Sequence, residues 1–214
     1  MKRLLIGGGS LGTVMGIGLG LVFPMHRVPS GSMWPTFDAG DRIFTARIAK
    51  QPFRGVILAF HPPEHREQMV AKRVVGLGGD VVATTGGELS INGWKVPRCM
   101  VGRASAGAHD GTLFVEWLGL ESYLVFEEKS SVAPAGEWTV ASGQYFVLGD
   151  NRNNSDDSRS WFGGAGGGVP LAETHGRIVN HDKPELPKGA EALAPTLASC
   201  LAKRPEQTDP PPRT

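Results

Sequence analysis

The chain has 214 residues, with 22 lysines and arginines against 21 aspartates and glutamates, which gives a formal net charge of +1 at pH 7. This length allows one core, or one core with a small subdomain, and excludes two large independent domains. The nearly balanced charge provides no long-range positive field, so nucleic acid is not expected as a partner.

The first residues of the chain predict a membrane anchor. After Met1, Lys2 and Arg3, the uncharged stretch 4–23 is long enough to cross the hydrocarbon core as a helix, which takes about 20 residues. The preceding basic residues place 1–3 in the cytoplasm and everything after the span on the periplasmic side. A cleaved secretory signal is the alternative, but residues 23–27 contain few of the small residues that a cleavage site needs. We therefore expect a retained, single-pass anchor in the inner membrane.

Residues 24–182 predict a periplasmic domain that is mostly β. Many of the 30 glycines and 16 prolines separate short apolar runs, and no long run here has the periodicity of a helix. Asn92-Gly93 lies between two such runs and predicts a tight type I′ hairpin. A β excursion from the main sheet is expected near 97–142. Strands are expected at 42–46, 56–60, 69–75, 80–84, 113–117, 123–126 and 144–148.

Residues 183–214 are rich in proline and poor in large apolar side chains, which predicts a disordered tail. A short helix near 190–203 is the alternative, although Pro195 is expected to interrupt it. The two cysteines, Cys99 and Cys200, belong to no CxxC motif or Cys/His cluster, so their spacing does not predict a zinc site. Because Cys200 lies in the tail, we expect two unpaired thiols.

Three segments carry residues suited to catalysis. Residues 29–36 form a turn-rich segment around Ser32, where a hydroxyl can be presented beside backbone N–H groups as acyl transfer requires. Strand alternation places Lys72 on the same face as two valines, and loss of hydration there lowers the pKa of an amine by up to about 3–5 units. The polar loop 149–159 follows an apolar run and contains Asp157 and Arg159, which are close enough to pair. Each segment alone has an ordinary alternative: a turn-capping serine, a lysine reaching solvent from an edge strand, and a solvated turn.

Taken together, these segments resemble the ordered signature motifs of bacterial type I signal peptidases. The resemblance covers roughly residues 28–179 and includes the Asn92-Gly93 hairpin. Four motifs carry it: Ser30-Gly31-Ser32-Met33-x-Pro35-Thr36, Gly40-Asp41, Lys72-Arg73-Val74-x-Gly76-x-x-Gly79-Asp80, and Gly149-Asp150-Asn151-Arg152 through Ser155-x-Asp157-Ser158-Arg159.

The resemblance implies a serine endopeptidase with two mostly antiparallel β subdomains and neither metal nor organic cofactor. Its substrates would be secreted preproteins, cut after small-x-small sites at the surface of the bilayer. In this family the residue matching Ser32 is the nucleophile and the one matching Lys72 is the general base. The supporting positions are Ser30 for the oxyanion, Ser155 for orienting the amine, and the pair Asp157 and Arg159.

Some positions depart from the family pattern, and other functions remain open. Asn153 stands where an aspartate is usual, and Asp156 adds a charge beside Ser155. A maturation peptidase of conjugative transfer with dedicated substrates, or a catalytically silent periplasmic binding module, would fit the same outline. A Ser-His-Asp hydrolase is disfavoured because the Gly-x-Ser-x-Gly match at residues 8–12 lies inside the predicted membrane span, and none of the four motifs contains a histidine. A self-cleaving repressor would need a DNA-binding segment in place of the span. We also expect Trp34 and Phe37 to help seat the domain at the bilayer.

Overall fold

The computed structural model describes residues 23–47, 53–181 and 183–211 of the chain. The predicted cytoplasmic start at 1–3 and, except for Phe23, the predicted span at 4–23 lie outside these residues. Among the described residues, no helix has the length and apolar character needed to cross a bilayer.

The described chain folds into three antiparallel sheets, as the sequence predicts for a mostly β protein. A seven-stranded sheet has the order β1-β2-β14-β3-β4-β12-β13. Its strands are β1 (Met25–Arg27), β2 (Arg42–Ala46), β3 (Ile57–Phe60), β4 (Val70–Leu77), β12 (Gln144–Leu148), β13 (Val169–Pro170) and β14 (Thr174–Ile178).

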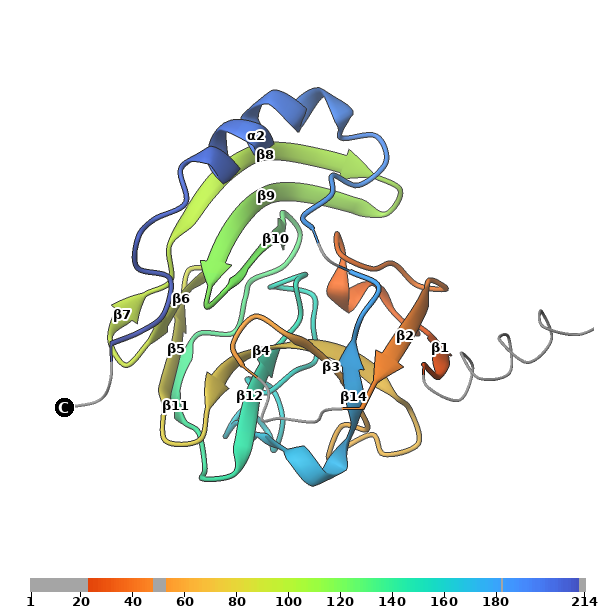
Figure 1. Cartoon of the computed structure of the whole chain (residues 1–214), viewed down its shortest axis with the longest axis vertical. Coiled ribbons are helices and arrows are strands. Elements are labelled where there is room, and N and C mark those ends of the chain that lie inside the picture. Colours follow the sequence, from red (N-terminus) through yellow and green to blue (C-terminus); the bar gives the residue numbers. More distant parts are fainter. Residues whose placement is uncertain (1–22, 48–52, 182, 212–214) are drawn as a thin grey trace, which may run out of the picture.

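Two smaller sheets complete the fold (Figure 1). The four-stranded sheet contains β11 (Gly136–Thr139), β5 (Val81–Thr85), β6 (Glu88–Ile91) and β7 (Trp94–Lys95), in that order. The three-stranded sheet contains β10 (Glu121–Glu128), β9 (His109–Leu118) and β8 (Arg98–Ala106). This last sheet falls within the range expected for the excursion, and the division into subdomains stays a prediction.

The hairpin predicted at Asn92-Gly93 is confirmed. These two residues join β6 to β7, and their φ angles of 53° and 78° are the positive values that a type I′ turn requires. The Asn92 side chain also holds the base of the hairpin, because its Oδ1 accepts a hydrogen bond from the Val81 backbone N–H and its amide donates to Asp80.

The segment after residue 182 differs from the prediction of a disordered tail. Residues 194–202 form helix α2 (Ala194–Ala202), which packs along β8 (Figure 1). Pro195 does not interrupt this helix, because it lies in the first turn, where its missing N–H has no partner to lose. Leu197 and Cys200 are buried against the core of the three-stranded sheet, and this apolar contact explains why the helix forms.

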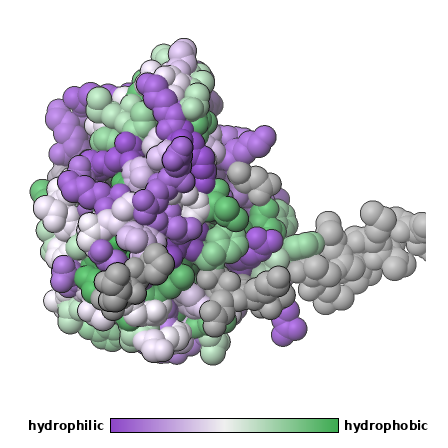
Figure 2. Space-filling model, turned by 60° about the vertical axis from the view of Figure 1, so that its left-hand side comes forward, coloured by the Kyte–Doolittle hydropathy of each residue, from purple (hydrophilic) through white to green (hydrophobic). Residues whose placement is uncertain are grey.

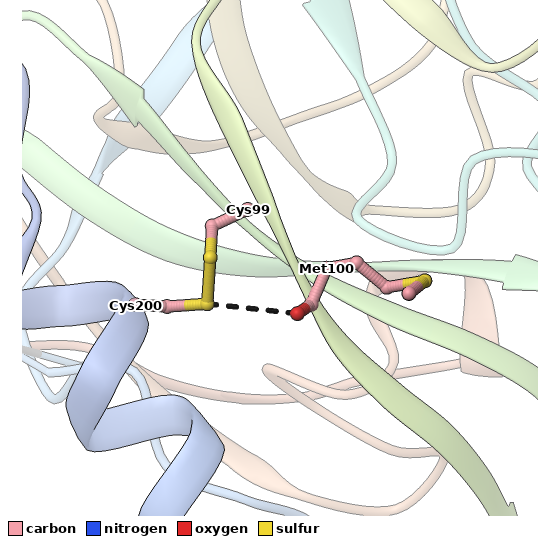
Figure 3. The surroundings of a disulfide bond; sticks show 3 residues. All are labelled: Cys99, Met100 and Cys200. Atoms are coloured by element: carbon pink, nitrogen blue, oxygen red, sulfur yellow. Dashed lines mark hydrogen bonds between the residues drawn. A yellow bond between two sulfur atoms is a disulfide. The ribbon is translucent and has the colours of Figure 1, made fainter.

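The two cysteines form a disulfide bond, so the expectation of unpaired thiols is wrong. Cys99 of β8 and Cys200 of α2 are bonded, with 5.8 Å between their Cα atoms (Figure 3). The Cys200 Sγ also lies 3.6 Å from the Met100 carbonyl oxygen. The bond therefore fixes the C-terminal helix to the outer strand of the three-stranded sheet.

Trp34 and Phe37 are buried, with 4% and 6% of their surface exposed. The Trp34 ring stacks on His109 at 4.6 Å and meets Phe126 edge-on at 4.3 Å. Phe37 packs in the core cluster that contains Met33 and Ile43. Side chains held inside the fold cannot also contact lipid, so the hypothesis that these two aromatics seat the domain at the bilayer is wrong.

Candidate active site

Ser32 lies in a short 3-10 turn, η1 (Gly31–Met33), whose backbone is anchored on both sides. Met33 is 1% exposed and Trp34 is 4% exposed, and the two side chains enter different core clusters. The Ser32 carbonyl oxygen accepts a hydrogen bond from the backbone N–H of Asn151 at 3.1 Å. These contacts fix the backbone and leave the Ser32 hydroxyl facing the Lys72 amine.

Lys72 reaches Ser32 from the interior of the seven-stranded sheet. It lies on β4, which has neighbours on both sides, and only 2% of its surface is exposed. The alternative of a lysine reaching solvent from an edge strand is therefore wrong. Lys72 Nζ donates a hydrogen bond of 2.5 Å to Ser32 Oγ. The fold therefore brings together two residues that are 40 positions apart in the sequence.

Burial lowers the pKa of the Lys72 amine from 10.5 to about 8. Removal from water is the largest cause, because it penalises the charged form. The carboxylates of Asp157 and Asp156 raise the pKa, as does Asp150 more weakly, while the Arg159 guanidinium lowers it. Desolvation outweighs the carboxylates, so a substantial fraction of the amine is neutral at mildly alkaline pH.

Ser30 and Ser155 both line the site, but of the two only Ser30 forms a side-chain hydrogen bond to a described residue there. Ser30 Oγ donates a hydrogen bond to Ser32 Oγ at 3.2 Å. Ser155 Oγ is buried and has no hydrogen-bond partner in the described part of the chain, so it does not hold the Lys72 amine in this structure. Gly149 allows this close packing, since a Cβ there would collide with Ser155 Oγ and the Ser32 carbonyl oxygen. The sequence motif included Gly149, but no local pattern assigned it this role.

Asp157 and Arg159 pair beneath the site. Arg159 Nε and Nη2 each donate a hydrogen bond of 2.8 Å to the Asp157 carboxylate, and both residues are buried. The same carboxylate accepts a bond from the Gly149 backbone N–H at 3.0 Å. Burial alone would raise the pKa of Asp157, but Arg159, the hydrogen bonds and the Lys72 charge lower it below its ordinary value.

Two further buried ion pairs, which the sequence did not predict as pairs, fix the loop 149–159. Arg73 of β4 donates bonds of 2.8 and 2.6 Å to the Asp150 carboxylate. Arg152 donates bonds of 2.9 and 2.5 Å to Glu116 of β9. Bidentate pairing of this kind offsets the cost of removing both charges from water.

The three-stranded sheet also contacts the nucleophile turn, a link that the sequence did not indicate. His109 Nδ1 lies 2.9 Å from Glu128 Oε1, and the same oxygen accepts a bond of 3.0 Å from the Asn151 side chain. That Asn151 amide lies 3.4 Å from the Gly31 carbonyl oxygen. Partial burial alone would raise the pKa of Glu128, but hydrogen bonds from its amide and histidine neighbours lower it.

An open cleft of about 610 Å³ adjoins the Ser32 side chain. Apart from Gly31, the residues that line it have short polar side chains: Ser30, Ser32, Asn153, Asn154, Ser155, Asp156 and Ser160. Within residues 23–47, 53–181 and 183–211, no group of three or more His, Cys, Asp or Glu side chains is arranged to hold a metal ion. The Ser32 hydroxyl, which is paired with the buried Lys72 amine, is therefore accessible from this cleft.

Comparisons with known proteins identify the family of the chain. The profile of the family described as "Signal peptidase, peptidase S26" matches residues 6–180. Signal peptidase I of Pseudomonas aeruginosa is 37% identical over 159 residues, covering 66% of this chain and 56% of that protein. Signal peptidase I of Leptolyngbya laminosa is 32% identical over 183 residues, covering 79% of this chain and 73% of that protein.

Among solved structures, a signal peptidase I from Enterococcus faecalis is 29% identical, with a TM-score of 0.38. The alignment covers 61% of this chain and 98% of that one. The chain spans about 56% of the length of the Pseudomonas relative. The profile match, which includes the Ser32 turn, the Lys72 strand and the loop 149–159, shows that the chain belongs to the signal peptidase family, peptidase S26.

Proposed function

We propose that this chain is a membrane-anchored serine endopeptidase that removes signal peptides from exported preproteins after small-x-small sites. In this proposal Ser32 is the nucleophile and Lys72 the general base. The observation that carries it is the hydrogen bond of 2.5 Å between a buried lysine amine and a serine hydroxyl at the edge of an open cleft. Membership of the signal peptidase family supports the same activity.

The geometry supports a defined sequence of proton transfers. With Lys72 neutral, the Ser32 hydroxyl donates its proton to Nζ as Oγ attacks the scissile carbonyl carbon. The resulting oxyanion would accept hydrogen bonds from the Ser32 backbone N–H and the Ser30 hydroxyl. In this structure the Ser30 hydroxyl donates to Ser32 Oγ, so the Ser30 hydroxyl must rotate in order to donate to the oxyanion. The lysine then returns the proton to the leaving amine, and water attacks the acyl-enzyme with the same amine as base.

The supporting residues keep the amine at this position. The ion pair of Asp157 and Arg159 lies beneath the amine. The Asp157 carboxylate raises the pKa of Lys72 and so limits the decrease that burial causes. Ser155 Oγ has no hydrogen-bond partner within the described residues, and in this proposal it accepts a hydrogen bond from the protonated amine. Both roles agree with those that the resemblance implies for these positions.

We also propose that the catalytic domain works at the surface of the inner membrane, on its periplasmic side. The span at 4–23 would anchor the chain, with 1–3 in the cytoplasm and 24–182 outside. Nine positions separate Phe23 from Ser32, a distance of at most about 30 Å even when extended. Figure 2 shows hydrophobic residues at the surface on the side where the described chain begins. The facing residues Met25 of β1 and Phe44 of β2 are 51% and 38% exposed and replace the buried aromatics as candidates for lipid contact.

The proposal is tested by cleavage of a preprotein with an Ala-x-Ala site by the full-length chain in mild detergent. Lys72→Ala should lower the rate about 10²- to 10⁴-fold, the range that a positioned general base contributes, and Ser32→Ala should abolish cleavage because it removes the nucleophile. Lys95→Ala is the matched control, because the Lys95 side chain is 79% exposed and belongs to the distant β7. Normal cleavage by Lys72→Ala would refute the assignment of the base.

A further inference from the structure

Asp156 stands apart from the other residues that line the cleft. Of the eight lining residues, all within the described part of the chain, it alone carries an ionisable side chain. The others are serines, asparagines and Gly31. The Asp156 side chain is 53% exposed, so a bound peptide can reach it.

The contacts of Asp156 leave much of its negative charge unpaired. Ser160 donates a hydrogen bond of 2.5 Å to Oδ1, which orients the carboxylate but does not neutralise it. His65 Nε2 lies 3.8 Å from Oδ2, and the His65 side chain is itself 57% exposed and shared with Glu67. No lysine or arginine of the described residues forms an ion pair with Asp156. Its neighbour Asp157, by contrast, forms a buried bidentate ion pair with Arg159.

From this arrangement we propose that Asp156 forms an acidic subsite beside the nucleophile, which favours substrates with a lysine or arginine next to the scissile bond. The inference rests on the proposed function, since it concerns the peptide that Ser32 would cut. A small-x-small site sets only the residues before the bond and leaves the adjacent positions free to vary. At those positions a half-exposed carboxylate attracts a cation and repels an anion.

The expected preference is modest because solvent screens the carboxylate. Pairs of exposed charges change equilibria by about 1.4- to 5-fold. A comparison of lysine with glutamate includes both attraction and repulsion, so the two factors multiply and the ratio should be about 2- to 25-fold. The ratio should also decrease as salt is added, since ions screen such pairs over about 10 Å at 0.1 M.

The test uses the full-length enzyme in mild detergent and a set of Ala-x-Ala peptides that differ at one position. Lysine, glutamine or glutamate is placed between the two alanines, or at the first or second residue after the scissile bond. The kcat/KM ratio of the lysine to the glutamate peptide is measured for the wild type, Asp156→Asn and Asp209→Asn. The last variant removes one charge from a side chain that is 59% exposed and does not line the cleft. Each ratio compares two peptides on one enzyme, so any change in Lys72 ionisation cancels.

We expect a ratio above about 2 at one or more positions in the wild type and in Asp209→Asn, falling to near 1 in Asp156→Asn. A wild-type ratio near 1 at every position would overturn the subsite, and so would a preference that survives in Asp156→Asn. In both of these cases the peptides are still cut and the proposed function stands. A wild type that cuts none of the peptides would instead refute the proposed function and the subsite with it.

Discussion

Replacing Lys72 with methionine should stabilise the folded protein while abolishing its activity. Methionine has a similar length and no charge, so it fills the same buried space on β4 without the cost of removing an ammonium group from water. The variant therefore separates the catalytic use of Lys72 from its effect on folding.

The size of the effect follows from the pKa of the amine. Folding lowers this pKa from 10.5 to about 8. One pKa unit corresponds to about 1.4 kcal/mol, so the charged amine costs the fold roughly 3 kcal/mol at pH 7. The hydrogen bond from Lys72 to Ser32 returns about 1 kcal/mol of this. We expect the free energy of unfolding of Lys72→Met at pH 7 to exceed that of the wild type by about 1–3 kcal/mol.

The sign of the pH dependence gives a second readout. Between pH 8 and pH 10.5 the unfolded lysine keeps its proton while the folded one has released it. The unfolded state therefore binds more protons, and wild-type stability attributable to this group rises with pH across that window. Lys72→Met lacks this rise, so its advantage should be full below pH 8 and vanish above about pH 10.5.

The assay is urea unfolding of the full-length chain in mild detergent, followed by tryptophan fluorescence at pH 7, 8, 9 and 10. Glutamine at position 72 is the polar control and should gain less than methionine, because its amide must be satisfied inside the sheet. A Lys72→Met variant less stable than the wild type at pH 7, or a constant difference between the two from pH 7 to pH 10, would refute this account of the buried amine.

Three further predictions concern the site and its supports. The kcat/KM of the wild type should rise with pH through a midpoint near 8 as Lys72 deprotonates, and Asp156→Asn should move this midpoint to lower pH, since it removes a charge that raises the lysine pKa. Cys200→Ser should lower the free energy of unfolding by about 2–5 kcal/mol; added reductant should destabilise the wild type but leave this variant unchanged in a thermal melt. Arg152→Met should cost about 3–5 kcal/mol because it leaves Glu116 buried and unpaired, and Glu116→Leu in the same chain should restore most of that loss in urea unfolding.

Local sequence patterns predicted the structure correctly where it depends on residues that are neighbours in the chain. The Asn92-Gly93 turn needs only two residues that tolerate positive φ, and the structure has them there. The alternation around Lys72 indicated that the amine would lie among valines, and its burial follows from the position of β4 inside the sheet. The signature motifs also identified the two side chains that meet at 2.5 Å.

Local patterns did not predict the structure where it depends on contacts between segments that are far apart in the sequence. The disulfide joins residues 101 positions apart, and only the packing of α2 on β8 brings the two sulfurs together. The contact of Glu128 with the nucleophile turn likewise depends on how the three-stranded sheet lies against the rest of the fold. Trp34 was predicted to contact lipid because an aromatic near a membrane span has two possible environments, and sequence alone does not distinguish a buried ring from an interfacial one.

The loop 149–159 holds the site in place because its buried polar side chains link β4, the nucleophile turn and the three-stranded sheet. Asp150 joins it to Arg73 on β4, the strand that carries Lys72, and also accepts a bond of 2.6 Å from Thr36 beside the nucleophile turn. Arg152 joins the same loop to β9. Both pairs are buried, so breaking either one leaves an unpaired charge inside the protein. Moving the loop would therefore cost free energy. This penalty holds the Ser32 hydroxyl within hydrogen-bonding distance of the Lys72 amine, even though burial disfavours the charged form of that amine.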